Sequence, residues 1–232
     1  MRRSWKSERS GKICLPIVET TVKKALRAIE EANRLADLIE LRVDYLRNTG
    51  LEMLLNAGEK PLIVTNRRRA EGGRYAGDEK KRLAILQEAA DLGAAFVDVE
   101  IRTQRSSLRE FIKNKNGTRM ILSFHDFKRT LPPSKLQELL DRMIRDGADV
   151  AKIATFARSW EDNLKVLSLI PYARKRKQAI VAFCMGEKGK MSRIFAPLMG
   201  AAWTYASLDQ RRASAPGQLT AWELKEIWER LG

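Results

Sequence analysis

The sequence predicts an α/β fold in which one domain, residues 1–232, forms a (β/α)8 (TIM) barrel. Short apolar runs alternate with longer segments of helical periodicity along the whole chain. There are eight such runs, and 232 residues divided among eight units give 29 residues per unit, which suits this barrel. A doubly wound open sheet is the alternative, but no GxGxxG or GxxxxGKS motif follows the first run.

The apolar runs predict strands because their composition is that of segments buried on both faces of a sheet. They cover residues 12–18, 36–44, 61–67, 94–101, 119–127, 148–155, 178–186 and 200–208. The segments that follow them carry apolar residues at i, i+3, i+4 and i+7, and several open with Ser, Thr, Asp or Pro, as helices do. These predicted helices cover residues 20–35, 51–58, 78–93, 105–114, 133–147, 159–175, 190–200 and 220–232.

The chain is strongly basic, with 44 Lys and Arg against 29 Asp and Glu and a net charge of +15. This charge permits nucleic acids or anionic metabolites as partners. The basic residues are spread along the chain, however, with clusters at 67–69 and 174–177, and solvated helix ends or loop rims explain both. We therefore expect no nucleic-acid partner, and a basic nucleic-acid-binding protein is kept as the non-enzyme alternative.

Cysteine usage and hydropathy predict a cytoplasmic protein without a membrane partner. Cys14 and Cys184 lie far apart in apolar stretches without CxxC spacing, which favours reduced core thiols. The basic amino terminus is followed by an apolar run too short for a signal peptide, and no stretch approaches the length of a membrane span. No cluster of His, Cys and Asp has metal-ligand spacing, so no metal is expected.

Polar residues follow or end several of the predicted strands. In a (β/α)8 barrel the carboxyl ends of the strands surround one shared pocket, so these side chains are the candidates for an active site. Glu40 and Arg42 are two residues apart and therefore point to the same side of their strand. The candidates from the strand ends and the loops after them are Glu40, Arg42, Arg67, Glu71, His125, Lys152, Arg193, Ser214 and Gln218.

Lys152 is the most unusual of these residues, because it lies within a run of small apolar residues. Burial disfavours an ammonium and lowers the pKa of a lysine, a nearby arginine lowers it further, and the uncharged amine is a nucleophile for ketones. In the alternative interpretation Lys152 reaches solvent or pairs with a carboxylate such as Glu40. His125 is the only histidine, and the alternative to a catalytic role is that it is an ordinary core or surface residue. The coincidence of these residues at strand ends favours catalysis.

The other candidates have structural alternatives as well. Glu40 and Arg42 could form an ion pair inside the barrel. Glu71 could be a solvated residue beside a Gly-Gly turn. Arg193 could be a charge on a helix surface, and the loop 214–218 could be a plain connection around its Pro-Gly turn.

Six motifs in these segments resemble those of the type I 3-dehydroquinate dehydratases, which are Schiff-base (β/α)8 enzymes of the shikimate pathway for aromatic amino acid biosynthesis. The resemblance runs from Lys12 to the carboxyl terminus, in the order of the family. Its carriers are ELRVD (40–44), TxRxxxEGG (65–73), SFHDF (123–127), KIA (152–154), MGxxGxxSR (185–193) and ASAPGQ (213–218).

The resemblance implies a lyase in which Lys152 forms an imine with the ring ketone of 3-dehydroquinate. His125 would remove the C2 proton and return a proton to the departing C1 hydroxyl, giving 3-dehydroshikimate by syn loss of water. Glu71 would orient His125. The implied substrate-binding residues are Glu40, Arg42 and Arg67 for ring hydroxyls, Arg193 for the carboxylate, Met185 in the pocket wall, and Ser214 and Gln218 on a closing loop.

The family resemblance further implies no metal or organic cofactor, and a homodimer. Two departures from the family pattern stand out. Residues 1–11 are short for the hairpin that covers the bottom of the barrel in many members, so a reduced amino-terminal cap is expected. Asn66 stands where many members have an aromatic residue, followed by the additional Arg68 and Arg69. Another lysine-dependent barrel enzyme, an aldolase or transaldolase, remains the closest alternative.

Overall fold

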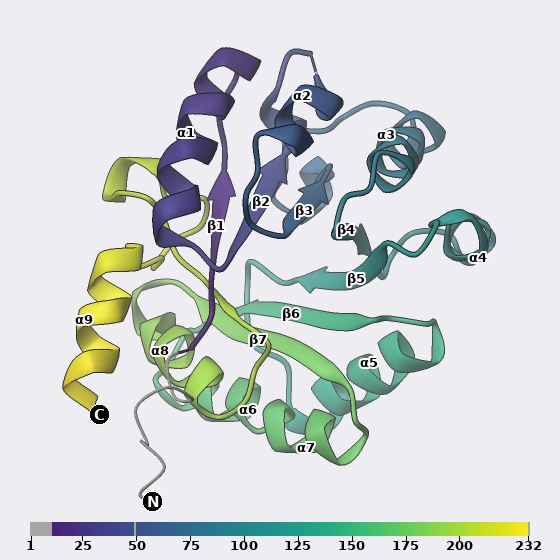
Figure 1. The fold of residues 1–232 in the computed structure, drawn as a ribbon. Helices are drawn as coiled ribbons and strands as arrows, with labels where there is room; N and C mark the ends of the chain where they lie inside the picture. Colours follow the sequence, from purple (N-terminus) through teal and green to yellow (C-terminus); the bar gives the residue numbers. More distant parts are fainter. Residues whose placement is uncertain (1–10, 49, 232) are drawn as a thin grey trace, which may run out of the picture.

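The computed structural model describes residues 11–48 and 50–231, and these form eight parallel strands in one sheet (Figure 1). The strands are β1 (Ile13–Ile17), β2 (Leu38–Arg42), β3 (Leu62–Thr65), β4 (Phe96–Glu100), β5 (Arg119–His125), β6 (Val150–Phe156), β7 (Ala179–Met185) and β8 (Thr204–Tyr205). Their order is β7-β6-β5-β4-β3-β2-β1-β8. Ala202 N donates to Ile180 O (2.8 Å), which links the segment before β8 to β7. The predicted (β/α)8 barrel is confirmed, and it is nearly closed.

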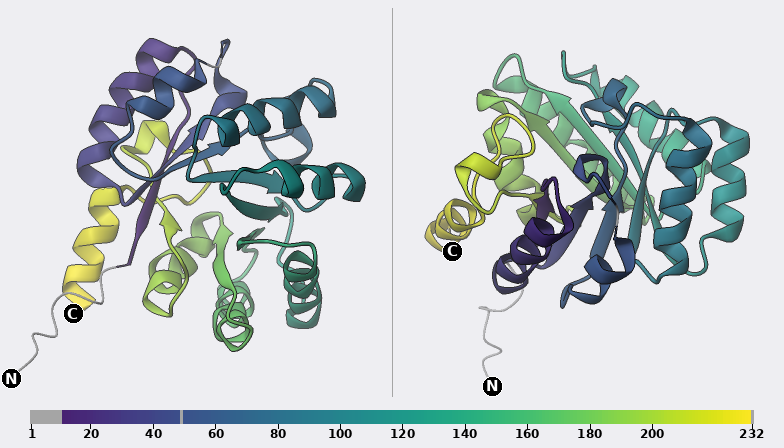
Figure 2. Two further views of the ribbon diagram at one scale, coloured as in Figure 1. Left: turned by 45° about the vertical axis from the view of Figure 1, so that its right-hand side comes forward. Right: turned by 90° about the horizontal axis from the view of Figure 1, so that it is seen from above.

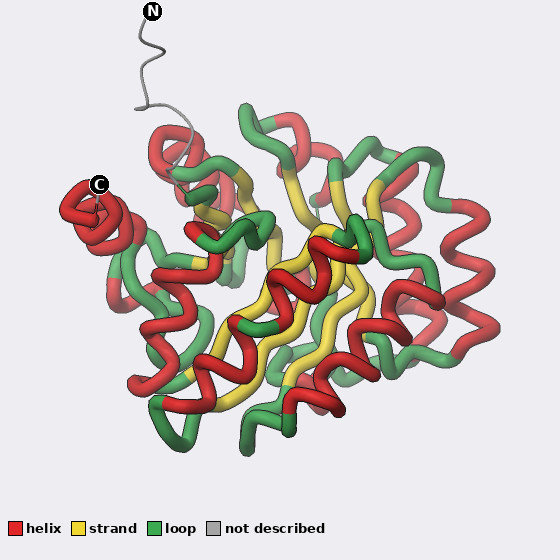
Figure 3. Tube along the Cα trace, turned by 90° about the horizontal axis from the view of Figure 1, so that it is seen from below, coloured by secondary structure: helices red, strands yellow, loops and turns green. Residues whose placement is uncertain are grey.

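The helices surround the strands, as the views from above and below show (Figures 2 and 3). They are α1 (Val22–Leu35), α2 (Leu51–Asn56), α3 (Glu79–Asp91), α4 (Arg105–Asn114), α5 (Pro133–Arg145), α6 (Glu161–Leu167), α7 (Leu169–Lys175), α8 (Lys190–Leu198) and α9 (Ala221–Leu231). Among the described residues, no helix combines the length and the apolar composition that a membrane crossing requires.

One predicted helix is wrong in its extent. The segment 159–175 forms two helices, α6 and α7, which meet at Ser168. Pro171 explains the interruption, because it has no N–H group to donate to the carbonyl of Leu167. The reduced amino-terminal cap was predicted at residues 1–11. Of these, residues 1–10 lie outside the described residues, so the prediction is not tested.

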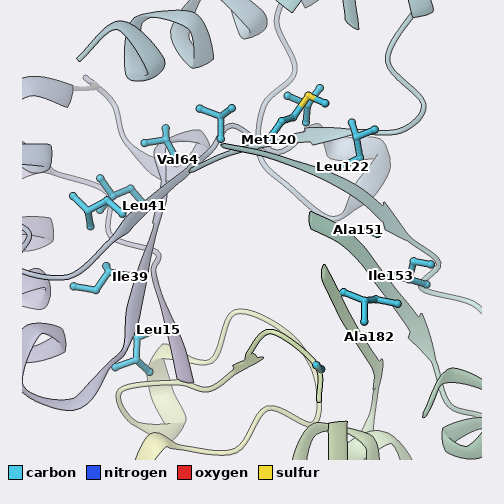
Figure 4. Close-up of a cluster of buried hydrophobic side chains, with 14 of the residues drawn as sticks. Leu15, Ile39, Leu41, Val64, Met120, Leu122, Ala151, Ile153 and Ala182 are labelled. Atoms are coloured by element: carbon cyan, nitrogen blue, oxygen red, sulfur yellow. The ribbon is translucent and has the colours of Figure 1, made fainter. Parts of the chain in front are cut away.

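Successive residues along the strands point alternately to two apolar clusters, one on each face of the sheet. One cluster packs between the sheet and the helices, and Figure 4 shows strand residues that belong to it: Leu15, Ile39, Leu41, Val64, Met120, Leu122, Ala151, Ile153 and Ala182. The alternate residues form a second cluster inside the barrel, with Cys14, Leu38, Ile63, Phe96, Ile121 and Val150 at the amino-terminal part of the strands. Side chains of period two on a strand point to opposite faces. The next inward positions are therefore free to carry polar groups above an apolar floor.

Candidate active site

One pocket lies at the carboxyl ends of the strands, and all ten predicted site residues line it. They are Glu40, Arg42, Arg67, Glu71, His125, Lys152, Met185, Arg193, Ser214 and Gln218. Sequence reasoning missed other lining residues, among them Phe127, Phe183 and Tyr205. The fold thus brings the ten together from strands and loops distant in sequence, whereas the role of each one remains a prediction.

Strand register places Lys152 and His125 on the inner face of the barrel. Ser123 of β5 is opposite Lys152 of β6, and His125 is opposite Ala154. Because alternate residues of a strand share a face, His125 lies on the same face as Ser123, two positions nearer the pocket mouth than the level of Lys152. The lysine is therefore below the histidine on the neighbouring strand.

Lys152 is 4% exposed, and its amine is paired with two carboxylates. Nζ lies 3.1 Å from Glu40 Oε1 and 3.0 Å from Asp98 Oδ2. It also lies 4.2 Å from the centre of the Tyr205 ring, where the π face attracts a cation. All three contacts stabilise the ammonium. The pairing with Glu40, the alternative interpretation for Lys152, is therefore present, whereas the uncharged amine expected from the sequence stays a prediction.

Asp98 is the principal residue of the site that sequence reasoning missed. It is fully buried on β4, where Arg67 Nη2 donates to Oδ2 (2.6 Å) and Ser123 Oγ donates to Oδ1 (2.6 Å). Burial raises the pKa of Asp98, but Arg67 and Lys152 outweigh it and the net shift is well below the usual range. The signal was present in the sequence, because Asp98 and Glu100 have the same two-residue spacing as Glu40 and Arg42.

Glu40 and Arg42 do not pair with each other, so the barrel-interior ion pair considered for them is wrong. Arg42 forms two hydrogen bonds with Asp44, both 2.8 Å long. Glu40 Oε1 accepts from Thr65 Oγ1 (2.8 Å) and from Lys152. Each of the two residues is thus held by a different neighbour at the edge of the pocket.

Glu71 is buried and contacts the imidazole of His125, with Oε2 3.1 Å from Nδ1. The solvated-residue alternative for Glu71 is therefore wrong. A short 3-10 turn, Arg69–Glu71, carries the carboxylate, and the following glycines allow the close approach. A Cβ on Gly73 would lie 2.0 Å from the carbonyl oxygen of Arg67. Gly73 is therefore required for the loop to fold back and direct Glu71 at the histidine.

The surroundings set the protonation of this pair. Burial, with the neighbouring Arg67 and Lys152 cations, lowers the pKa of His125 well below 6.5, so its imidazole is neutral at neutral pH. Burial raises the pKa of Glu71 to about 7. When Glu71 is ionised it accepts the Nδ1 proton and leaves a lone pair on Nε2. When Glu71 is protonated it donates to Nδ1, and the proton of the ring then resides on Nε2.

Arg193 is fully buried and lacks an anionic partner among the described residues. Nη1 donates to the carbonyl of Tyr205 (3.4 Å), and the guanidinium lies 4.3 Å from the centre of the Phe183 ring. Nε and Nη2 have no hydrogen-bond partner within the described part of the chain. Burial lowers the pKa of Arg193 to about 10, which still leaves it charged at neutral pH. The helix-surface alternative is wrong, and a buried guanidinium with free donors suits a carboxylate.

The loop 214–218 closes one side of the pocket. Gln218 Oε1 accepts from the Ser214 backbone N–H (2.7 Å) and from its hydroxyl (3.2 Å), while Gly186 N donates to Pro216 O (3.0 Å). Gly217 has a φ of +71°, and a Cβ there would lie 2.1 Å from Gly186 O. The loop therefore packs closely on the loop after β7. Within the described residues, Gln218 Nε2 has no partner.

Metal binding receives no support from the side chains. In the described ranges 11–48 and 50–231, no group of three or more His, Cys, Asp or Glu residues is arranged to hold a metal ion. The carboxylates in the pocket and Asp98 beneath it instead contact Lys152, arginines, Thr65, Ser123 and His125. What the arrangement offers is a lysine amine, an imidazole with one defined neighbour, and an unpaired guanidinium around one cavity.

Fold and pocket together define a (β/α)8-barrel enzyme with a lysine and a histidine on neighbouring strands of one polar site. The sequence profile of the type I 3-dehydroquinase family matches residues 13–232, and the chain belongs to this family. It is 38% identical to the 3-dehydroquinate dehydratase of Methanocaldococcus jannaschii over 220 residues, covering 93% of this chain and 97% of that one. Its identity to the enzyme of Pyrococcus abyssi is 37%, with coverages of 95% and 98%.

Solved structures of the same family superpose well on this one. The 3-dehydroquinate dehydratase of Geobacillus kaustophilus gives a TM-score of 0.87 at 29% identity, with 96% of this chain and 91% of that chain covered. The type I enzyme of Clostridium difficile gives 0.86 at 26% identity, with coverages of 97% and 93%. The family is one of hydro-lyases, so the enzyme class expected from the sequence is confirmed.

The contact between Glu71 and His125 predicts which ring nitrogen of His125 carries the proton. NMR can measure this directly, because His125 is the only histidine of the chain. In 15N-histidine NMR spectra, we expect the Nδ1–H tautomer above pH 7. The Nε2–H tautomer should replace it as the pH falls through about 7, because Glu71 then takes up a proton. In the Glu71→Gln variant this transition should vanish. An ordinary imidazolium titration near 6.5 in the wild type, or an unchanged transition in the variant, would contradict the prediction.

Proposed function

We propose that this protein catalyses the syn elimination of water from 3-dehydroquinate, giving 3-dehydroshikimate, through an imine on Lys152, as a step of the shikimate pathway. The single observation that carries the proposal is the placement of buried Lys152 and His125 on adjacent strands of one pocket that also contains the unpaired Arg193. Relatives that cover the chain are 3-dehydroquinate dehydratases. The Clostridium difficile structure contains covalently modified comenic acid, which is consistent with covalent chemistry in this family.

The reaction begins when the Lys152 amine attacks the ring ketone at C3. The carbinolamine loses its hydroxyl as water and leaves a protonated imine. Its positive charge withdraws electrons from C2, so that the C2–H bond becomes acidic and the resulting carbanion is stabilised as an enamine. The chain supplies the amine from the floor of the pocket, where Tyr205 and the two carboxylates hold Nζ in place.

His125 is the base for the C2 proton. Its Nε2 has a lone pair when ionised Glu71 accepts from Nδ1, and its lowered pKa keeps the imidazole neutral and ready to accept. After taking the proton, His125 gives a proton to the C1 hydroxyl, which leaves as water. Hydrolysis of the imine then releases 3-dehydroshikimate and restores Lys152. One imidazole on one face of the ring accounts for syn stereochemistry.

Arg193 binds the carboxylate of the substrate in this proposal. The Nε and Nη2 groups are the unpaired donors, and a guanidinium matches a carboxylate with two parallel hydrogen bonds. Anchoring the carboxylate at Arg193 and the ketone carbon at Lys152 fixes the ring at two points. The C2 position between them is then held for His125, which is the geometric part of the rate enhancement.

The remaining pocket residues contact the ring and exclude water. Glu40, Arg42 and Arg67 are expected to meet the ring hydroxyls, and Met185 lines the wall. Ser214 and Gln218 lie on the loop that packs on Gly186, and the unpaired Gln218 Nε2 is a donor for the ligand. Closure of this loop protects the imine from premature hydrolysis.

Further features of the assembly and its location remain predictions from the family resemblance and the sequence. We propose a single-domain enzyme that forms a homodimer in the cytoplasm and has neither a nucleic-acid partner nor a metal or organic cofactor. The spread of basic residues along the chain supports the absence of a nucleic-acid site.

Reduction with borohydride tests the nucleophile. Incubation with 3-dehydroquinate and borohydride should attach the reduced ligand to Lys152, as peptide mass spectrometry would show, because an iminium is reduced to a stable amine. Lys152→Ala should lose the adduct and all turnover, whereas Lys165→Ala, on the exposed side of α6, should keep both. An adduct on another lysine would show that Lys152 is not the nucleophile and contradict the proposed mechanism.

His125→Ala should separate imine formation from elimination. We expect kcat to fall by about 10²- to 10⁴-fold, the usual contribution of a general base, while the adduct at Lys152 is still trapped. Formation of the conjugated product is followed by ultraviolet absorbance. Turnover near the wild-type rate would show that another group removes the C2 proton.

Arg193→Met should raise KM and lower kcat/KM by about 10- to 100-fold, because a charge-assisted contact to the carboxylate is lost. The buried guanidinium has two unpaired donors, so its replacement by an apolar side chain of similar length should not lower the melting temperature. Kinetics and thermal unfolding measure the two effects. An unchanged KM with a large loss of stability would assign Arg193 to structure instead.

A further inference from the structure

We propose that the two carboxylates at Lys152 have separate tasks. Asp98 is the permanent counter-ion of the nitrogen, both as ammonium and as iminium, and Glu40 is the base that takes a proton from the amine before it attacks and returns it when water leaves. The inference rests on the proposed imine mechanism. It concerns the imine-forming steps and not the removal of the C2 proton by His125.

Imine formation at Lys152 requires a base that can hold one proton for a time. Nζ of Lys152 contacts two carboxylates, which favour an ammonium, and an ammonium has no lone pair with which to attack a ketone. An ammonium and a ketone give an iminium and water, so no net proton is lost. One proton must nevertheless leave Nζ before attack, reside on a base, and then join the carbinolamine hydroxyl as the C–O bond breaks. The base must contact Nζ and reach the pocket.

Asp98 is unsuited to hold that proton. Both of its oxygens are occupied, Oδ2 by Arg67 Nη2 and Lys152 Nζ and Oδ1 by Ser123 Oγ. It is fully buried and does not line the pocket. Protonation would remove the charge that balances two buried cations, which is strongly unfavourable. Its neighbours also lower the pKa of Asp98 against the effect of burial, so it stays ionised.

Glu40 has the opposite arrangement. Within the described residues, its hydrogen bonds are those from Thr65 and Lys152, both to Oε1, and Lys152 is the one cation at ion-pair distance. It lines the pocket into which the leaving water passes. A proton on Glu40 therefore disturbs fewer contacts than one on Asp98, and it lies next to the space occupied by the carbinolamine.

The fixed charge of Asp98 matters after the imine has formed. An iminium withdraws electrons from C2 only while it is protonated, and a neutral imine is a much weaker electron sink. Asp98 at 3.0 Å and the Tyr205 ring at 4.2 Å both favour a cation at this nitrogen. Asp98 thus acts in the C–H step, whereas Glu40 acts in imine formation and hydrolysis.

Isotope effects with 2-deuterated 3-dehydroquinate distinguish the two tasks. In Glu40→Gln, imine formation should become rate-limiting, so kcat falls by about 10²- to 10⁴-fold and the isotope effect on kcat approaches one. In Asp98→Asn, the C–H step should become slower, so kcat falls by about 10- to 100-fold and the isotope effect equals or exceeds that of the wild type. Rapid-quench borohydride trapping should show slow adduct formation in Glu40→Gln alone.

Two milder variants show whether the effects of Glu40→Gln and Asp98→Asn come from the lost carboxylates and not from misfolding. Ser123→Ala removes one donor to Asp98 and should lower kcat less than Asp98→Asn, with the isotope effect retained. Glu40→Asp keeps a carboxylate and should recover part of the trapping rate. The reverse isotope pattern, or wild-type trapping in Glu40→Gln, overturns this inference. If the wild type itself forms no adduct, the proposed function fails instead.

Discussion

The burial of the Lys152 amine is the constraint on which the rest of the site depends. Removing a charged amine from water costs several kcal/mol, so Nζ of Lys152 requires negative charge at contact distance. Glu40 and Asp98 supply it from β2 and β4, 112 and 54 residues away in sequence. The nearly closed parallel sheet brings β2, β4 and β6 around one point above an apolar floor. The same closure therefore makes both the barrel and the charge balance of its interior.

From Asp98, a row of ion pairs with alternating charges extends outwards to α3. Arg67 pairs with Asp98 and also with Glu100 (3.2 Å), and Arg82 of α3 pairs with Glu100 (2.6 Å). Each side chain is thus fixed by the next, and the row reaches Glu79 on the same helix as Arg82. Fixed dipoles and charges of this kind need little rearrangement during a reaction. Burial, together with the cations Arg67 and Lys152, accounts for the neutral His125, because an imidazolium beside these cations is unfavourable.

Local patterns in the sequence were sufficient for the barrel and for nine of the ten pocket residues, whereas Met185 was predicted from the family resemblance. Apolar runs marked the strands, and polar residues at their ends marked the pocket. The ion pairs of Lys152 depend on which carboxylates face it across the barrel, and that follows from the register of distant strands. Asp98 was missed because its run was treated as apolar throughout. The interruption at Ser168 was missed because apolar periodicity continues through Pro171.

Arg193 and Lys152 are the two ends of the site, and they differ in one respect. Lys152 has two carboxylates in the folded protein, whereas Arg193 has none among the described residues. Burial without an anionic partner is a penalty for the charged guanidinium, and it lowers the pKa of Arg193 to about 10. A ligand carboxylate removes that penalty at Arg193 alone, since the charge at Lys152 is already balanced. In the proposed reaction, this difference would orient 3-dehydroquinate with its carboxylate at Arg193 and its carbonyl carbon at the Lys152 amine. A ligand bound the other way round would leave Arg193 unpaired and place a third negative charge beside Asp98 and Glu40.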